Sequence, residues 1–281
     1  MIGERGWGSR ILRIYLPVMG SLVLMLFPFY WMLIASIKPN RELYNAKIMP
    51  LIVYQPTLKH YYDLFADTNF LLWTYNTMLV AVITTAVSLV LGAMIAYPLA
   101  RMNFPGAAIV AIGVAATYLV PQPLLFIPMA DIINKLELGN TLSAVMLTYP
   151  TLLIPFCAWL LMGYFKSVPR ELEEAARIDG ASRFQAMWRV VLPLTTPGLL
   201  SAGIFAFTLA QNEFLYALIF LAKSEVRTVP VGAITELIRG DVFYWGQLMA
   251  AALLGSIPVA VIYSFFVDYY VAGLTAGSVK S

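Results

Sequence analysis

The chain has 281 residues, of which 60% are hydrophobic and only 12% are charged, and its formal net charge is +3. A soluble domain carries about a quarter of its residues as charged side chains, so this composition, with a mean hydropathy of +0.79, is hard to reconcile with one and indicates a protein embedded in lipid. The basic residues are scattered rather than gathered on one helix or tail, so no nucleic acid is expected as a partner.

Apolar stretches long enough to cross a bilayer core, which needs about 20 helical residues, recur along the chain. Backbone polar groups find no water in hydrocarbon, so each stretch is expected to be helical, which predicts an all-α polytopic membrane protein with six transmembrane helices in one domain, residues 1–281. The first stretch exceeds a signal-peptide core and is interpreted as an uncleaved span. The six predicted spans are 14–37, 71–100, 107–130, 141–165, 197–222 and 247–271.

Prolines interrupt several of these spans, and each removes a helical hydrogen bond. Pro121 and Pro123, together with Pro128, are expected to bend the third span sharply. The chain has one cysteine, Cys157, and one histidine, His60, which are too few for a typical structural zinc site. Both are interpreted as packing or loop residues, and no metal or cofactor is expected on this chain.

A charged loop, residues 166–196, separates the fourth and fifth predicted spans. Ser167 can cap a helix that accepts Pro169 in its first turn and carries acidic residues near the positive end of its dipole. Gly180 lies where a left-handed residue is needed to close that helix, and Ser182 can begin a second one. The loop therefore predicts two short helices, which could be either a solvated loop or a handle that lies in a cleft on a partner.

The order of residues in this loop resembles the Glu-Ala-Ala loop of permease subunits from binding-protein-dependent ABC importers, in which a Gly and a Leu-Pro follow the Glu-Ala-Ala. The flanking residues resemble the carbohydrate branch, specifically the smaller maltose-type permease. The similarity continues along nearly the whole chain, through residues 28–32, 36–39, 76–77, 100–106 and 273–280. The loop residues that match are Glu174, Ala175, Ala176, Gly180, Leu192 and Pro193.

This resemblance implies a type I ABC importer permease, not an enzyme, located as a multi-pass protein in the cytoplasmic (inner) membrane of a prokaryote. It implies a second homologous permease subunit, two copies of an ATP-binding subunit, an extracytoplasmic sugar-binding protein, a carbohydrate substrate and contact with membrane lipid. The chain lacks a G-x-x-x-x-G-K-[ST] phosphate loop, so ATP and Mg²⁺ are expected on the partner. The residues implied to couple to the ATPase are Glu174, Ala175, Ala176, Asp179, Gly180 and Ala181.

Orientation in the membrane follows mainly from the loop, which must face the nucleotide. Residues 166–196 are therefore expected in the cytoplasm, and the distribution of Lys and Arg agrees only weakly with the positive-inside rule. The tail, residues 272–281, resembles the family's tail, which implies contacts with the ATPase through Gly277, Ser278 and Lys280. The alternative for the tail is a frayed terminus.

Polar residues also interrupt the predicted fifth span, at Gln211-Asn212-Glu213. An ionisable group inside a span costs roughly a few kcal/mol unless it faces protein or a water-filled cavity, so Glu213 is a functional candidate. Either it contacts substrate beside aromatic rings, or it is a buried carboxylate tied to a neighbouring helix. Tyr118, Gln122, Asn76 and Thr148 are each more typical of interhelical hydrogen bonds than of ligand contacts. The candidate substrate pathway comprises Tyr118, Gln122, Gln211, Asn212, Glu213 and Phe214.

A secondary transporter in which Glu213 carries a proton is the alternative function. Secondary carriers usually have more spans and internal inverted repeats, and they need no docking loop. A membrane-embedded enzyme is less compatible with the sequence, because no paired carboxylates, metal-ligand set or nucleophile constellation is present.

Overall fold

The structure, a computed structural model, describes residues 11–276. Within them, four single helices are long and apolar enough to cross a membrane. Two bent helix pairs are also long and apolar enough when the two helices of each pair are taken together. The predicted all-α polytopic fold is confirmed, with six spans when each bent pair is one span. The single helices are Arg13–Ile37, Phe70–Arg101, Leu142–Ser167 and Trp245–Val267; the pairs are Ala107–Tyr118 with Gln122–Lys135 and Arg183–Leu194 with Thr196–Gln211.

The third span bends sharply, as predicted. Helix α6 (Ala107–Tyr118) and helix α7 (Gln122–Lys135) meet at 92°. Pro121 is the N-cap of α7 with extended backbone angles, φ −59° and ψ 123°, and Pro123 occupies its first turn, where a missing N–H costs no helical bond. The prolines therefore end one helix and begin the next.

The fifth span differs from its prediction, 197–222. Helix α13 (Thr196–Gln211) ends at Gln211, and a separate short helix, α14 (Leu215–Phe220), follows. The Glu213 carboxylate accepts the backbone N–H groups of Tyr216 and Ala217, at 2.9 and 3.2 Å, which satisfies donors that the first turn of a helix leaves free. Glu213 is thus not inside a continuous helix but at a helix break that it stabilises.

The described residues form two compact units, one of residues 11–70 with 233–257 and the other of residues 71–232 with 258–276. In the first unit, α2 ends at Ile37 because Lys38 is extended before Pro39, and α2 packs against α4. This unit contains η1 (Ile11–Tyr15), α2 (Leu16–Ile37), α3 (Asn40–Leu43), α4 (Lys59–Asp67), the antiparallel hairpin β1 (Ile238–Arg239) and β2 (Val242–Phe243), and the first part of α16 (Trp245–Ala276).

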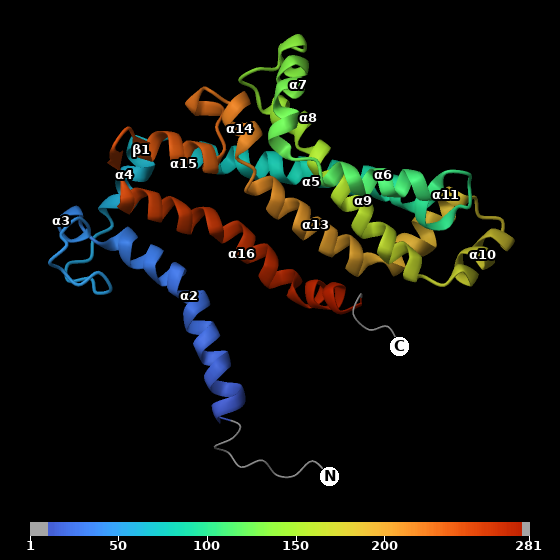
Figure 1. Cartoon of the computed structure of the whole chain (residues 1–281), viewed down its shortest axis with the longest axis horizontal. Coiled ribbons are helices and arrows are strands. Elements are labelled where there is room, and N and C mark those ends of the chain that lie inside the picture. The colour runs from blue at the N-terminus through green and yellow to red at the C-terminus, as the bar shows by residue number, and fades with distance from the viewer. Residues whose placement is uncertain (1–10, 277–281) are drawn as a thin grey trace. The chain divides into compact units, whose positions relative to one another are not determined.

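In the second unit, α6 and α13 pack on α9, and α10 and α11 lie at one end (Figure 1). One core cluster surrounds the buried rings of Tyr149, Phe207 and Tyr216, and another lies around Tyr97 and Phe165. The remaining elements of this unit are α5 (Phe70–Arg101), α8 (Leu142–Thr148), α9 (Pro150–Ser167), α10 (Arg170–Ile178), α11 (Arg183–Ala186), η2 (Met187–Val191), α12 (Leu192–Leu194), η3 (Ser224–Val226) and α15 (Val229–Leu237), which extends into the first unit.

Candidate functional site

The loop between α9 and α13 folds as two helical segments, α10 and then α11 continuing through η2 into α12. Gly180 has φ +91°, the left-handed conformation predicted for it. Ser182 forms a capping box: its hydroxyl accepts the N–H of Gln185 at 3.2 Å, and the Gln185 side chain accepts the N–H of Ser182 at 2.9 Å. The predicted end of the first helix and start of the second are both confirmed.

The predicted cap at Ser167 is wrong. Ser167 is the last residue of α9, and its hydroxyl donates to the carbonyl of Tyr164 at 2.8 Å. Val168 is extended because a residue that precedes proline is disfavoured in the helical region, and Pro169 then becomes the N-cap of α10. The helix therefore begins two residues later than a serine cap would require.

Most residues of α10 are exposed. Among the residues predicted to couple to the ATPase, Glu174, Ala175, Asp179 and Gly180 are exposed, whereas Ala176 and Ala181 are half-buried. Two apolar side chains on the same helix are also exposed, Leu172 at 45% and Ile178 at 87%. A charged helix that leaves large apolar groups in water has the character of an interaction surface.

Glu173, the neighbour of Glu174, faces α5. Its carboxylate accepts the Tyr97 hydroxyl at 2.5 Å and lies 3.6 Å from the Nε of Arg101, so it joins α10 to the end of α5. Reasoning from sequence missed this residue. The signal available was the acidic run before Ala175, but helical pattern alone does not say which carboxylate faces the bundle.

A cavity of about 590 Å³ in the second unit brings together most of the predicted pathway residues. Tyr118 lines it and is 48% exposed, and its ring lies 5.7 Å from that of Phe156. Gln211 is buried and does not line the cavity. The predicted pathway residues that line the cavity are Tyr118, Gln122, Asn212, Glu213 and Phe214, beside Tyr149 and several aliphatic residues.

Glu213 makes hydrogen bonds to two helices that line this cavity, α7 and α14. It is 9% exposed, and its carboxylate accepts the side-chain amide of Gln122, at the start of α7, at 2.8 Å, besides the two N–H groups of α14. Asn212 is exposed and donates to the carbonyl of Thr208 at 2.9 Å. The break in the third span and the break after α13 are therefore held together at one carboxylate.

The other polar residues in apolar helices have structural partners. Asn76, predicted to make an interhelical hydrogen bond, donates to the carbonyls of Glu225 in η3 and of Arg227 just after it, at 2.9 and 3.0 Å. The Thr148 hydroxyl instead donates to Ala144 one turn earlier in α8, so an interhelical bond was the wrong prediction for it, because a threonine hydroxyl readily bonds back within its helix. Cys157 is buried in a core cluster.

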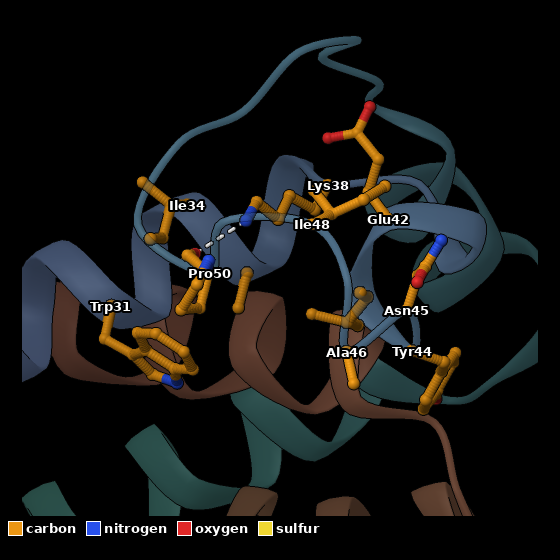
Figure 2. A pocket seen from close by; sticks show the side chains of 11 residues that line it. Trp31, Ile34, Lys38, Glu42, Tyr44, Asn45, Ala46, Ile48 and Pro50 are labelled. Atoms are coloured by element: carbon orange, nitrogen blue, oxygen red, sulfur yellow. Dashed lines mark hydrogen bonds between the residues drawn. The ribbon is translucent and has the colours of Figure 1, made fainter.

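The first unit has its own cavity, of about 310 Å³, between α2 and the loop that follows it (Figure 2). The Lys38 side chain extends along this loop and donates to the carbonyls of Met49 and Pro50, at 3.1 and 2.6 Å. Glu42 accepts the N–H groups of Tyr54 and Gln55, at 3.1 and 2.9 Å. Two buried charged residues thus organise the loop from within.

His60 belongs to the same region and is 5% exposed. Its Nε2 lies 2.7 Å from the carbonyl of Lys38, which makes it a packing residue as predicted. Within residues 11–276, no three His, Cys, Asp or Glu side chains are grouped as a metal site would require.

Comparison with known proteins gives consistent matches over the chain. A family described as the binding-protein-dependent transport system inner membrane component matches residues 88–275. The sulfoquinovosyl glycerol transport system permease protein SmoH of Agrobacterium fabrum is 38% identical, covering 92% of this chain and 90% of its own. The trehalose/maltose transport system permease protein MalG of Thermococcus litoralis is 33% identical, covering 97% and 99%. A crystal structure of a bacterial ABC transporter for import of the acidic polysaccharide alginate matches with a TM-score of 0.77 at 20% identity, covering 95% and 99%.

Proposed function

The chain belongs to the family of binding-protein-dependent transport system inner membrane components and is a permease subunit of a sugar ABC importer, and from this premise we propose that it couples sugar passage to ATP hydrolysis on a separate subunit through α10. The observation that carries the proposal is the exposure of α10, which leaves Glu174, Leu172 and Ile178 exposed, with Asp179 exposed at its C-terminal end. Carboxylates can pair with basic partner groups, and the apolar side chains fill a cleft.

The assembly that this implies has a second permease, two ATP-binding subunits that hold ATP and Mg²⁺, and an extracytoplasmic sugar-binding protein. The loop of residues 166–196 then faces the cytoplasm of a prokaryotic inner membrane. When ATP draws the ATP-binding subunits together, each docked α10 is displaced and the helices connected to it move as levers. Sugar released from the binding protein enters a pathway that the two permeases share.

Purification of the full chain from its own cells in mild detergent tests this assembly. An ATP-binding subunit and a second permease should co-purify, and ATP hydrolysis should rise when the sugar-loaded binding protein is added. Isolation of the chain without an ATP-binding subunit, in every nucleotide state, would contradict the proposal.

The secondary-transporter alternative with Glu213 as a proton carrier is not supported. The matched family works with binding proteins, and the Glu213 carboxylate accepts hydrogen bonds from Gln122, Tyr216 and Ala217. A carrier carboxylate must gain and lose its proton on each cycle, which would break some of these bonds and loosen α14.

For the substrate pathway, we propose that the cavity around Tyr118 is the part of this chain that meets the sugar. Apolar rings stack on the faces of sugar rings, and amides and carboxylates bond their hydroxyls, so Tyr118 and Asn212 are the exposed groups suited to contact it. Gln122 and Glu213 line the same cavity and shape it through their mutual bond.

Glu213→Gln tests the shaping role. One carboxylate oxygen becomes an amide donor that faces either the Ala217 N–H or the Gln122 amide, so at least one buried partner loses its acceptor, at a cost of about 1–3 kcal/mol in the free energy of unfolding. We expect a lower thermal midpoint in detergent and a higher KM for uptake, because the cavity wall loosens. Asn212→Ala is the matched control: it should raise the KM with little loss of stability. If Glu213→Gln alters neither quantity, the carboxylate has no role in the cavity.

The tail residues Gly277, Ser278 and Lys280 lie outside the described residues. We propose that they contact the ATP-binding subunits. Deleting residues 273–281 should leave membrane abundance near normal and weaken retention of the ATP-binding subunit. Ser278→Cys, on a Cys157→Ser background, should crosslink to that subunit. Absence of any crosslink, together with normal transport by the truncated chain, would identify the tail as a frayed end.

A further inference from the structure

Helix α10 is attached to the membrane-spanning part of the chain by a small polar cluster as well as by its own ends. The Tyr97 hydroxyl, near the end of α5, donates to Glu173 of α10 at 2.5 Å and also lies 3.2 Å from the carbonyl of Arg183, the first residue of α11. One turn further along α5, the Nε of Arg101 lies 3.6 Å from the other Glu173 oxygen. A single helix end thus holds both halves of the loop.

The cluster is buried, so the loss of one of its members is costly. The side chains of Arg101 and Glu173 are 3% and 14% exposed. Surface ion pairs are screened by water, whereas a buried pair that loses one partner leaves an uncompensated charge. Among the described residues, the Nε and one terminal nitrogen of Arg101 have no hydrogen-bond partner, so Glu173 is the counter-charge that the structure records.

The ring of Tyr97 is held by packing against a neighbouring span. Its ring is 3% exposed and packs edge-on against Phe165 of α9, with ring centroids 6.5 Å apart. The hydroxyl is therefore presented at a defined point by two spans. This is the arrangement expected of a rigid support for a mobile element, since the supporting group has its own packing.

The covalent connections of α10 are less restrictive. At one end Val168 and Pro169 are extended, and at the other Gly180 is left-handed. Neither connection continues a helix, so a push on α10 could be absorbed by rotation at its two ends. The bonds of Glu173, together with the packing of α10 against α11 and η2, oppose such rotation.

We propose that Tyr97, Arg101 and Glu173 form a latch that fixes α10 to the end of α5, so that displacement of the docked helix reaches the spans. The inference rests on the proposed coupling function. Adjacent carboxylates then have separate roles: Glu174 faces outward to the partner, and Glu173 faces inward to the latch. All three latch residues act as positioning residues and touch neither sugar nor nucleotide.

The mobility of α10 in the full-length chain tests the latch directly. Replacing Ile178, which is 87% exposed, by cysteine on a Cys157→Ser background gives a single site for a nitroxide label, because the chain has one natural cysteine. Tyr97→Phe keeps the packing ring and removes the hydroxyl. The ratio of mobile to immobile spectral components should rise about tenfold, the effect of losing a hydrogen bond to a charged group. Glu173→Gln should raise it as well, because it removes the counter-charge of Arg101 while its amide oxygen can still accept the Tyr97 hydroxyl, and the double variant should exceed either single variant.

Glu174→Gln is the matched control. It makes the same chemical change one residue away, on an exposed side chain, and should leave the label's mobility in the isolated chain unchanged. An unchanged spectrum in Tyr97→Phe and Glu173→Gln would overturn the latch. An equal rise in Glu174→Gln would overturn it too, since the effect would then reflect helix charge in general.

The assembled complex provides the functional measurement. Tyr97→Phe should retain its ATP-binding subunit and its ATP hydrolysis, yet the number of sugar molecules moved per ATP hydrolysed should fall about tenfold. Unaltered transport per ATP in a variant with a mobile α10 would overturn transmission through the latch. Failure of the coupling function itself has a different result: Glu174 variants would keep the ATP-binding subunit and normal uptake, whatever the spectra show.

Discussion

Replacing Gly180 by proline should reduce ATP-driven uptake by at least about a hundredfold while the chain still inserts in the membrane, because a proline in an incompatible position costs about 3 kcal/mol or more. Gly180 has φ +91°, whereas the proline ring holds φ near −65°. Its N–H also donates to the carbonyl of Arg177 at 3.1 Å, and proline has no N–H to give. The turn between α10 and α11 must therefore reorganise, and the docking surface moves with it.

Two further glycine variants isolate the effect of backbone strain, because neither position is crowded. No atom lies within 4 Å of a Cβ added at Gly180, so Gly180→Ala carries only the left-handed penalty of about 1–2 kcal/mol and should give an intermediate loss of uptake. Gly139 also has open space around it but no positive φ, so Gly139→Ala should transport normally. The measurements are uptake and membrane abundance. Normal uptake by Gly180→Pro would show that the geometry of this turn is irrelevant to coupling.

How far sequence predicts this protein depends on whether the controlling interaction is local. Gly180 and Ser182 were placed correctly, because a left-handed closing residue and a capping box involve neighbours only three or four residues apart. The first span, predicted as 14–37, was found at Arg13–Ile37, because a long apolar run between charged segments has few alternatives in a membrane.

The failures involve contacts between distant parts of the chain or competition between carboxylates. The apolar residues on both sides of Glu213 suggested one continuous span, but the carboxylate caps α14 and bonds Gln122, 91 residues away, so the helix breaks there. Likewise, Glu173 is distinguished from Glu174 only by Tyr97, 76 residues earlier in the chain. Lys38 lies in the segment 36–39 that resembles the family, yet its role inside the loop depends on carbonyls more than ten residues later.

Gly198→Ala should be strongly destabilising, lowering the free energy of unfolding by about 1–3 kcal/mol or more through overpacking. Helix α13 packs on α9 with Gly198 directly beneath the ring of Tyr164, and an added Cβ would lie 2.3 Å from the ring's Cγ. Real Cβ contacts are never so short, so either the ring or one of the helices must move. The contact joins the helices on either side of the 166–196 loop, so uptake should fall with stability.

Gly163 and Tyr164 give this prediction its controls. Gly163 precedes Tyr164 in α9 with open space around it, so Gly163→Ala should be neutral or stabilising by about 0.5–1 kcal/mol, as alanine is the better helix former. Tyr164→Ala removes the obstructing ring, and in the double variant the alanine at 198 should cost far less than it does alone. Thermal midpoints of the four detergent-purified proteins complete the cycle. Equal costs of Gly198→Ala with and without the Tyr164 ring would mean that α9 and α13 do not pack through this contact, and the base of the coupling loop would then need another support.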